Sequence, residues 1–185
     1  IPAVLFGDKY LEPDLVLVST NLTLLTSMFL HGGWMHLIGN MLFLWVFGDN
    51  VEDCLGHRRF IIFYVFSGIG GARTHALVNP ESVAPMIGAS GAISGILGAY
   101  LVLHPRAQVL VLAFMYIPIR LPAFVILGLW IGLQMLNASV AGSADGGGTA
   151  WWAHIGGFVA GIGLLFLLKT KTKANSVGRG PWGKR

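Results

Sequence analysis

Five apolar stretches separated by short polar connections constrain the fold of this chain more than any other feature. They cover residues 34–47, 60–77, 90–103, about 121–137, and 151–168. Because a bilayer offers no hydrogen bonds to the backbone, apolar stretches of this kind cross membranes as helices. Charged residues make up 11% of the sequence, against about 25% in an ordinary soluble domain, and the mean hydropathy is +0.71. The sequence therefore predicts an all-α polytopic membrane protein with five spans.

The chain divides into three parts by composition. Residues 1–33 hold short apolar runs broken by charged residues, which predicts an interfacial, partly helical loop at the outer face. Residues 34–168 form the membrane domain, in which 107–117 would lie along the interface because prolines separate them from the next span. Residues 169–185 are basic and poor in apolar side chains, so we predict a disordered tail. We expect this tail to meet the lipid bilayer and no nucleic acid.

Positive charge in the connections predicts how the spans are oriented. Lys and Arg occur in 48–59, in 104–120 and in the tail, whereas 78–89 and 138–150 contain neither. The positive-inside rule then places the C-terminus in the cytoplasm and residues 1–33 outside. Since the chain carries no organelle-targeting segment, we expect a bacterial inner membrane. The chain also begins with no initiator methionine or signal peptide, so we expect upstream sequence.

Polar residues gather at the outer ends of three different spans. His31, His36 and Asn40 lie at the first of them, Ser90 at the third and His154 at the last. At about 1.5 Å per helical residue, all five lie within roughly 10 Å of the outer interface. Polar groups inside a membrane are expensive, so by default they indicate a functional site near the periplasmic face.

Ser90 is the candidate nucleophile, and His154 is its candidate general base. Ser90 follows Gly88 and opens an apolar stretch, which puts it at a helix N-terminus whose free N–H groups suit an oxyanion. Gly157 and Gly161 share the helix face of His154. Since the stretch after Ser90 also has a small-residue face, close packing of the two helices would bring His154 to Ser90.

His36 and Asn40 are four residues apart and therefore project from one helix face. Both side chains donate hydrogen bonds, so together with the Ser90 N–H they would form an oxyanion hole. No Asp or Glu lies at the outer ends of the spans beside the histidines. A Ser–His dyad acting through an acyl-enzyme is therefore the economical mechanism.

Each feature also has a simpler interpretation. Gly91 and Gly95 form a GxxxG pair that is typical of helix packing, which by itself accounts for a serine between small residues. A histidine such as His36 can cap backbone carbonyls. The histidines could bind a metal, but the chain has no HExxH motif, so we expect no metal and no other cofactor. A transporter lined by histidines would carry polar residues along a whole pathway, whereas here they gather at one end.

Four motifs resemble those of the rhomboid family of intramembrane serine proteases. They are GxSG at 88–91, HxxxxHxxxN at 31–40, GxxxExxxG at 48–56 and AHxxGxxxG at 153–161. The motifs follow the order of the family and together cover roughly residues 20–168. Any one of them is weak evidence, whereas the set is specific.

The resemblance implies a rhomboid-like helical bundle in which Ser90 is the nucleophile and His154 is its base. It implies that His36, Asn40 and the Ser90 backbone stabilise the oxyanion. It assigns supporting roles to His31, Gly88, Gly91, Glu52, Gly157 and Gly161. Glu52 would tie down the inner end of its helix through Arg58 or Arg59.

The resemblance also implies a substrate class, namely single-span membrane proteins that are cut within or beside their transmembrane segment. Because the family core has six spans, the five found here imply that one precedes residue 1. Two departures stand out: the Trp-Arg pair of many members is missing near 21–23, and Arg73 has no assigned role. A catalytically silent membrane-protein binder with the same fold is the alternative, although such proteins usually lose the serine or the histidine. The sequence predicts neither the oligomeric state nor the physiological substrate.

Overall fold

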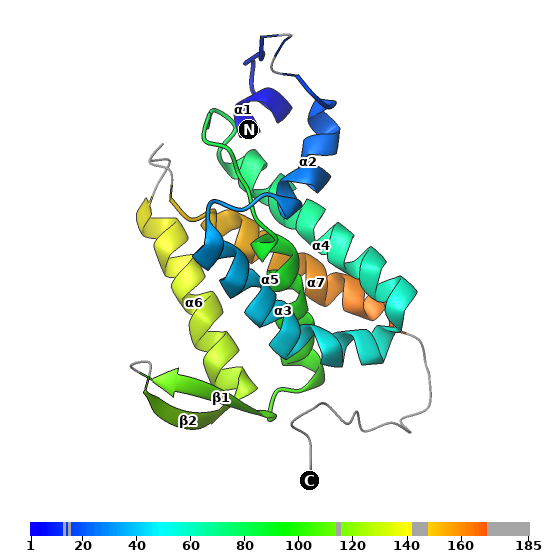
Figure 1. Cartoon of the computed structure of the whole chain (residues 1–185), viewed down its shortest axis with the longest axis vertical. Coiled ribbons are helices and arrows are strands. Elements are labelled where there is room, and N and C mark those ends of the chain that lie inside the picture. The colour runs from blue at the N-terminus through cyan, green and yellow to red at the C-terminus, as the bar shows by residue number, and fades with distance from the viewer. Residues whose placement is uncertain (13, 15, 114–115, 142–147, 170–185) are drawn as a thin grey trace.

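The computed structural model describes residues 1–12, 14, 16–113, 116–141 and 148–169. A bundle of five long helices dominates the described part (Figure 1). The helices are α3 (Trp34–Leu55), α4 (His57–Val78), α5 (Ser90–Leu103), α6 (Ala123–Ala141) and α7 (Trp151–Leu168). Each contains most of one predicted apolar stretch, so the predicted helical membrane bundle is confirmed.

The helices differ in their ability to cross a membrane. Three of those described, α4, α6 and α7, are long and apolar enough to do so. Helix α5 is apolar but has only 14 residues, or about 21 Å at 1.5 Å per residue. Because the hydrocarbon layer is about 30 Å thick, α5 is too short to reach both surfaces. Its N-terminus, which carries Ser90, can therefore lie below the membrane surface.

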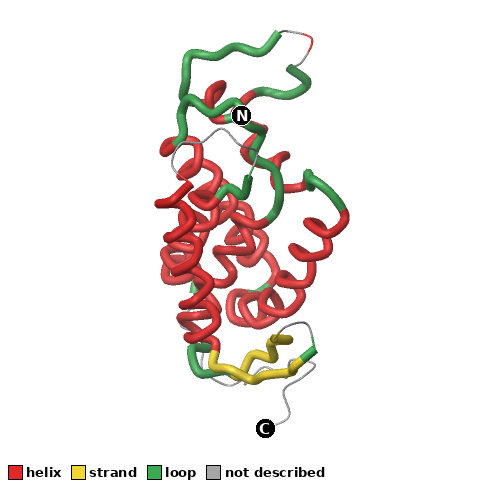
Figure 2. Tube along the Cα trace, turned by 90° about the vertical axis from the view of Figure 1, so that its left-hand side faces the viewer, coloured by secondary structure: helices red, strands yellow, loops and turns green. Residues whose placement is uncertain are grey.

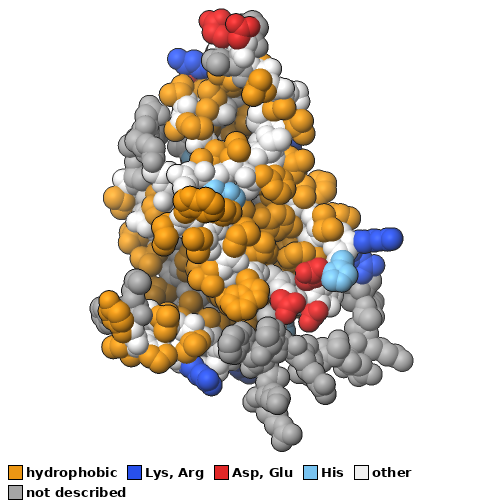
Figure 3. All heavy atoms as spheres, viewed as in Figure 1, with side chains coloured by type: hydrophobic (Ala, Val, Ile, Leu, Met, Phe, Trp, Pro, Cys, Tyr) orange, Lys and Arg blue, Asp and Glu red, His pale blue; other side chains and the backbone are white. Residues whose placement is uncertain are grey.

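Helix α5 is the centre of the bundle. Its residues 91–100 are all buried, and it packs mainly against α4 and α7. Large side chains that are fully buried include Phe63, Ile96, Leu127 and Leu165. The outer surface is also strongly apolar over the helices (Figure 3), with Leu129 and Leu167 among its exposed side chains. Such a surface fits contact with lipid chains.

Helices α5 and α7 approach each other through glycines, as their spacing predicts. A Cβ atom built on Gly157 would overlap the carbonyl oxygen of Gly91, and one on Gly161 would overlap that of Gly95. The obstacle in both cases is backbone, which cannot swing aside as a side chain can. The residues Gly157 and Gly161 therefore set the spacing between the helix that carries His154 and the helix that carries Ser90.

Gly161→Ala is expected to lower the free energy of unfolding by about 1–3 kcal/mol, because an added methyl group forces the two backbones apart. The matched control is Gly163→Ala on the same helix, where a Cβ meets nothing within 4 Å. That exchange should leave stability unchanged or raise it by up to about 1 kcal/mol through helix propensity. Thermal unfolding in detergent, followed by circular dichroism, measures both. Equal melting temperatures for the two variants would contradict the close approach.

A β-hairpin precedes α6, in a segment where no strands were predicted. Residues 107–117 were predicted as an interfacial segment, and β1 (Gln108–Ala113) in this segment pairs antiparallel with β2 (Ile117–Pro122). The strands contain β-branched residues, which favour strands, and the two prolines of β2 disfavour a helix there. Helix α6 begins directly after Pro122, slightly later than the predicted span.

The predicted charged loop at 48–59 is almost entirely helical. Helix α3 continues to Leu55, and α4 begins at His57. The bend between them rests on Gly56, whose φ of 78° lies in the region that favours glycine. Glu52 contacts His57 Nδ1 across this bend, whereas Arg58 or Arg59 was its predicted partner. Charged side chains are tolerated at the end of α3 and the start of α4, because these helix ends lie at the polar end of the bundle.

The N-terminal segment is partly helical, as its composition predicts. It contains α1 (Pro2–Leu5), α2 (Thr23–Thr26) and single 3₁₀ turns at Thr20–Leu22 and Ser27–Phe29. It lies at the end of the bundle opposite the hairpin (Figure 2). Backbone hydrogen bonds join it to the connection between α4 and α5, from Ala3 N to Ser82 O and from Gly88 N to Ser27 O. The predicted disordered tail falls almost wholly outside the described residues.

Candidate active site

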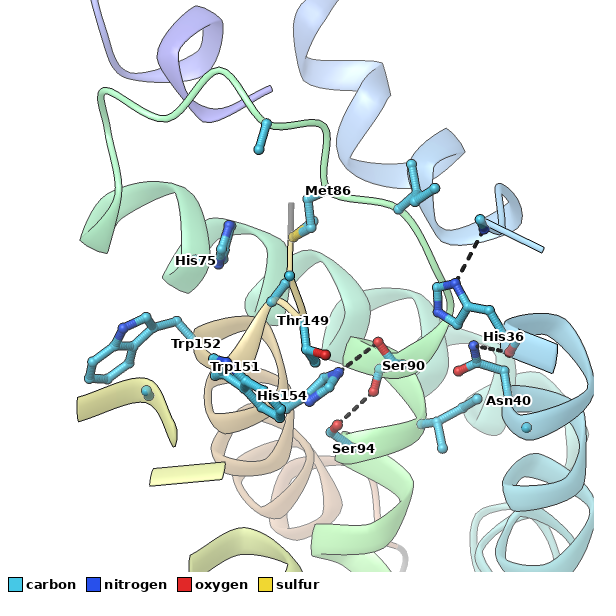
Figure 4. A pocket seen from close by; sticks show the side chains of 18 of the residues that line it. His36, Asn40, His75, Met86, Ser90, Ser94, Thr149, Trp151, Trp152 and His154 are labelled. Carbon is cyan, nitrogen blue, oxygen red and sulfur yellow. Dashed lines mark hydrogen bonds between the residues drawn. The ribbon is translucent and has the colours of Figure 1, made fainter. Parts of the chain in front are cut away.

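A cavity of about 910 Å³ opens into the bundle at the N-terminal ends of α3, α5 and α7. All five long helices contribute to its lining, together with the connection before α5 and the residues before α7. In the close view Ser90 lies between His154 on one side and His36 and Asn40 on the other (Figure 4). The structure thus brings together residues from three helices, α3, α5 and α7, that are distant in sequence.

Ser90 and His154 form a hydrogen bond between two helices. Ser90 Oγ lies 2.8 Å from His154 Nε2. Ser90 is the first residue of α5, and His154 lies in the first turn of α7. The glycine contacts between α5 and α7 bring these two helix ends close enough for a direct contact. A serine hydroxyl and an imidazole nitrogen at this distance can exchange a proton.

The other imidazole nitrogen of His154, Nδ1, contacts a residue that was not predicted from the sequence. His154 Nδ1 lies 2.8 Å from Oε1 of Gln134, a residue of α6. Gln134 is 6% exposed and His154 9%. The sequence prediction considered only carboxylates as partners of the histidines and did not include an amide. The available signal was a glutamine in an otherwise apolar stretch. Burying a polar side chain in a membrane costs free energy, so such a residue usually has a function.

Aromatic side chains enclose the imidazole of His154. The centroid of the Trp130 ring lies 5.9 Å from that of His154 at an interplanar angle of 34°. The Trp151 ring stands edge-on to it at 6.3 Å. These bulky neighbours limit rotation of the imidazole and exclude water from its faces. From the sequence, Trp130 was only part of an apolar stretch, and Trp151 was interpreted as an interface anchor at the start of the last span.

His36 is positioned to offer an N–H group to the cavity. The backbone N–H of Gly32 donates to His36 Nδ1 over 3.3 Å. In a neutral imidazole this leaves the proton on Nε2. A Cβ built on Gly88 would lie 2.8 Å from that Nε2, and Gly88 has a φ of 116°. Gly88 thus provides both the backbone conformation and the room for His36 close to Ser90.

Asn40 lies one helical turn beyond His36 and is 7% exposed. One N–H of its amide donates to the His36 carbonyl over 2.8 Å. The amide group has a second N–H, and Asn40 lines the same cavity as Ser90. The Ser90 carbonyl is held in turn by Ser94, whose hydroxyl donates to it over 2.6 Å. The predicted oxyanion donors therefore share the cavity with the serine.

The remaining predicted residues lie around the site or far from it. His31 packs edge-on against His36, with ring centroids 5.1 Å apart. Gly91, Gly157 and Gly161 lie in the contact between α5 and α7. Glu52 lies near the far end of α3, outside the cavity lining. In the described part of the chain, no three His, Cys, Asp or Glu side chains come close enough to hold a metal.

Several cavity residues were not predicted from the sequence. His75 and Asn79 contribute from the end of α4, and Trp152 from the start of α7. Arg73, whose role the sequence left open, is exposed on α4 and does not line the cavity. Nothing in the sequence pattern places α4 beside the site, because its polar residues are isolated within an apolar stretch.

Comparisons with known proteins identify the family of the chain. A model of the Rhomboid domain matches residues 19–171. The chain is 33% identical over 166 residues to Rhomboid protein 1, mitochondrial, of Saccharomyces cerevisiae, covering 85% of this chain and 44% of that protein. It is 34% identical over 161 residues to Rhomboid protease GluP of Bacillus subtilis, covering 86% and 28% respectively. RHOMBOID-like protein 5 of Arabidopsis thaliana is 34% identical over 158 residues, covering 85% and 47%.

The chain spans less than half the length of these curated relatives. The matched region nevertheless includes the whole described bundle from α3 to α7, with the cavity and its hydrogen-bonded serine. Together with its apolar helices, this match shows an integral membrane protein. The chain therefore belongs to the rhomboid family.

Proposed function

We propose that this protein is an intramembrane serine endopeptidase that cleaves the transmembrane segments of single-span membrane proteins. The observation that carries the proposal is the 2.8 Å hydrogen bond between Ser90 Oγ and His154 Nε2, formed between two helices inside an open cavity. Membership in a family that includes Rhomboid protease GluP supports it. No metal or other cofactor has a part in this chemistry.

The proposed reaction is acyl transfer to Ser90. His154 Nε2 accepts the hydroxyl proton as Oγ attacks the peptide carbonyl carbon, and the carbonyl oxygen becomes an oxyanion. His36 Nε2–H, the Asn40 amide and the Ser90 N–H stabilise that oxyanion. Collapse breaks the C–N bond, and His154 gives its proton to the leaving amine. Water, activated by the same base, then hydrolyses the acyl-enzyme and restores Ser90.

The cavity supplies two requirements of this reaction inside a bilayer. Its volume of about 910 Å³ has room for hydrolytic water and for an extended stretch of substrate. A peptide bond in a transmembrane helix is hydrogen-bonded within that helix, so its carbonyl is shielded from attack. The substrate must unwind locally before Ser90 can reach it, and the polar groups of the cavity can satisfy the backbone that unwinding exposes.

The proposal also includes a location and an orientation. The distribution of Lys and Arg supports a cytoplasmic C-terminus and an active site near the outer face. We keep the bacterial cell membrane as the proposed membrane; the relatives include both a mitochondrial protein and a protein of Bacillus subtilis. The presence of a further span before residue 1 stays a prediction.

Covalent labelling tests whether Ser90 is activated. A fluorophosphonate is expected to label Ser90 in the full natural protein, since only a serine with a general base reacts readily with such a probe. His154→Ala should reduce the labelling rate by at least about 10²-fold. His104→Ala, an exposed histidine beyond the other end of α5, is the matched control and should label as the wild type does.

Mass spectrometry of the labelled peptide identifies the modified residue. A folded wild-type protein that binds a membrane substrate without labelling at Ser90 would favour the silent binder instead. Labelling that is unaffected by His154→Ala would contradict the dyad.

A further inference from the structure

A buried glutamine completes a series of hydrogen bonds that ends at the Ser90 hydroxyl. The series runs from the Trp130 carbonyl through Gln134 and His154 to Ser90. We infer that Gln134 is a positioning residue that holds the proton of His154 on Nδ1 and thereby leaves Nε2 free to act as the base. The inference rests on the function proposed above, because it assigns the residue that prepares that base.

A backbone carbonyl on the same helix fixes the orientation of the Gln134 amide. Its Nε2 lies 3.4 Å from the Trp130 carbonyl oxygen, one turn earlier on α6. A carbonyl oxygen only accepts, so the amide nitrogen must face it. The opposite orientation would set two acceptor oxygens against each other. Gln134 Oε1 is therefore the atom that faces His154.

The Gln134 oxygen in turn fixes the position of the imidazole proton. Gln134 Oε1 is an acceptor 2.8 Å from His154 Nδ1, so Nδ1 carries the proton. A neutral imidazole has one N–H, which leaves a lone pair on Nε2. The Ser90 hydroxyl, 2.8 Å away, donates to that lone pair. In the other tautomer Nε2 would carry the proton and could not accept one from Ser90.

The surroundings explain why an amide serves here. Gln134 and His154 are both buried, at 6% and 9% exposure, in a bundle with an apolar exterior. None of the described residues that line the cavity is Asp or Glu. A carboxylate at this depth would have to be charged in a medium of low dielectric constant, at a high cost. An amide orients the imidazole through the same acceptor geometry and carries no charge.

Ring packing also helps to hold the imidazole of His154 in place. Trp130 and Trp151 restrict the imidazole plane. They leave its two nitrogens directed at Gln134 on α6 and Ser90 on α5. The ring position is thus held by packing, whereas the proton position depends on Gln134.

Two substitutions of Gln134 distinguish the effect of its acceptor oxygen from the effect of its side-chain volume. Gln134→Met keeps an unbranched side chain of similar length but removes the amide oxygen. Gln134→Glu keeps an acceptor oxygen at the same reach, because a buried carboxyl group stays protonated and can turn its O–H toward the Trp130 carbonyl. Gln108→Met makes the same exchange at an exposed position of β1 and is the matched control.

Kinetics and nitrogen NMR give independent measurements. In Gln134→Met we expect kcat to fall about tenfold with KM within about twofold, the loss of one oriented hydrogen bond. The ¹⁵N shifts of His154, assigned by their loss in His154→Ala, should move from the Nδ1–H tautomer toward a mixture. Gln134→Glu should restore the Nδ1–H signal and most of kcat, and Gln108→Met should change neither. Thermal unfolding verifies that each variant is folded.

The tautomer measurement needs no catalytic activity, so it decides the inference separately from the proposed function. If the wild type fails to cleave or label, the proposed function fails, while a change of tautomer in folded Gln134→Met still supports the inference. If the wild type is active but folded Gln134→Met keeps both the wild-type tautomer and kcat, the inference is overturned. It is also overturned if Gln134→Met and Gln134→Glu lose kcat equally without a change of tautomer, since Gln134 would then have a merely structural role.

Discussion

Ser90→Ala is expected to reduce cleavage of a single-span membrane substrate by at least about 10⁴-fold. The exchange removes only the oxygen that lies 2.8 Å from His154 Nε2 and that would form the acyl-enzyme. The N-terminus of α5 and the apolar contacts around it remain, so the fold should be retained. Cleavage is measured with purified full natural protein in liposomes that contain a tagged single-span substrate, and products are quantified by gel and mass spectrometry.

The control for this experiment is a serine exchange without a role in the site. Ser139 is exposed on α6, and its hydroxyl donates to the Leu136 carbonyl of the same helix. Ser139→Ala should retain the wild-type rate. Cleavage that persists in folded Ser90→Ala would sink the proposed mechanism. A Ser90→Ala protein that still captures uncleaved substrate would show that binding and chemistry are separate.

His36→Ala is expected to lower kcat by about 10² to 10³-fold, the usual effect of removing one oxyanion donor. The Gly32 N–H holds Nδ1 as an acceptor, which directs the Nε2 proton into the cavity. Because the donor acts on charge that develops in the transition state, KM should change much less than kcat. Steady-state kinetics in the same liposome assay separate the two parameters.

His57→Ala is the matched histidine control. His57 lies at the start of α4, at the other end of the bundle, and its side chain is 90% exposed. Its pair with Glu52 is therefore a surface contact that contributes little to stability. The variant should keep the wild-type kcat. A rise in KM alone for His36→Ala, with kcat unchanged, would exclude a role for His36 in oxyanion stabilisation.

Much of the bundle was predictable because membrane insertion obeys local rules. A run of apolar residues must become a helix in lipid, whatever its neighbours, so the stretches around 60–77 and 151–168 could be placed from the sequence. Glycine spacing also predicted which face of α7 meets α5, since only glycine permits the close approach seen at Gly157 and Gly161. The bend at Gly56 and the hairpin 108–122 were missed, because both depend on how the polar ends of helices meet.

The candidate site was likewise predictable only in part. Ser90, His154, His36 and Asn40 could be selected from sequence because polar groups at one depth of a membrane are rare. Gln134 is unusual as a polar residue in an apolar stretch, but the role of an amide is not evident until its partner is known. Its significance comes from the Trp130 carbonyl on one side and His154 on the other, and both contacts depend on the rotation of α6 about its axis.

Hydropathy and residue spacing are enough to predict that this chain crosses a membrane as helices and which residues could carry acyl-transfer chemistry. Hydrophobicity and helical periodicity act within each segment, so these properties can be read without the fold. The folded structure is needed to show that Ser90 and His154 lie 2.8 Å apart, that His36 lies beside Gly88 at the cavity, and that Gln134 contacts His154. Such contacts depend on the relative positions and rotations of separate helices, which packing in three dimensions sets.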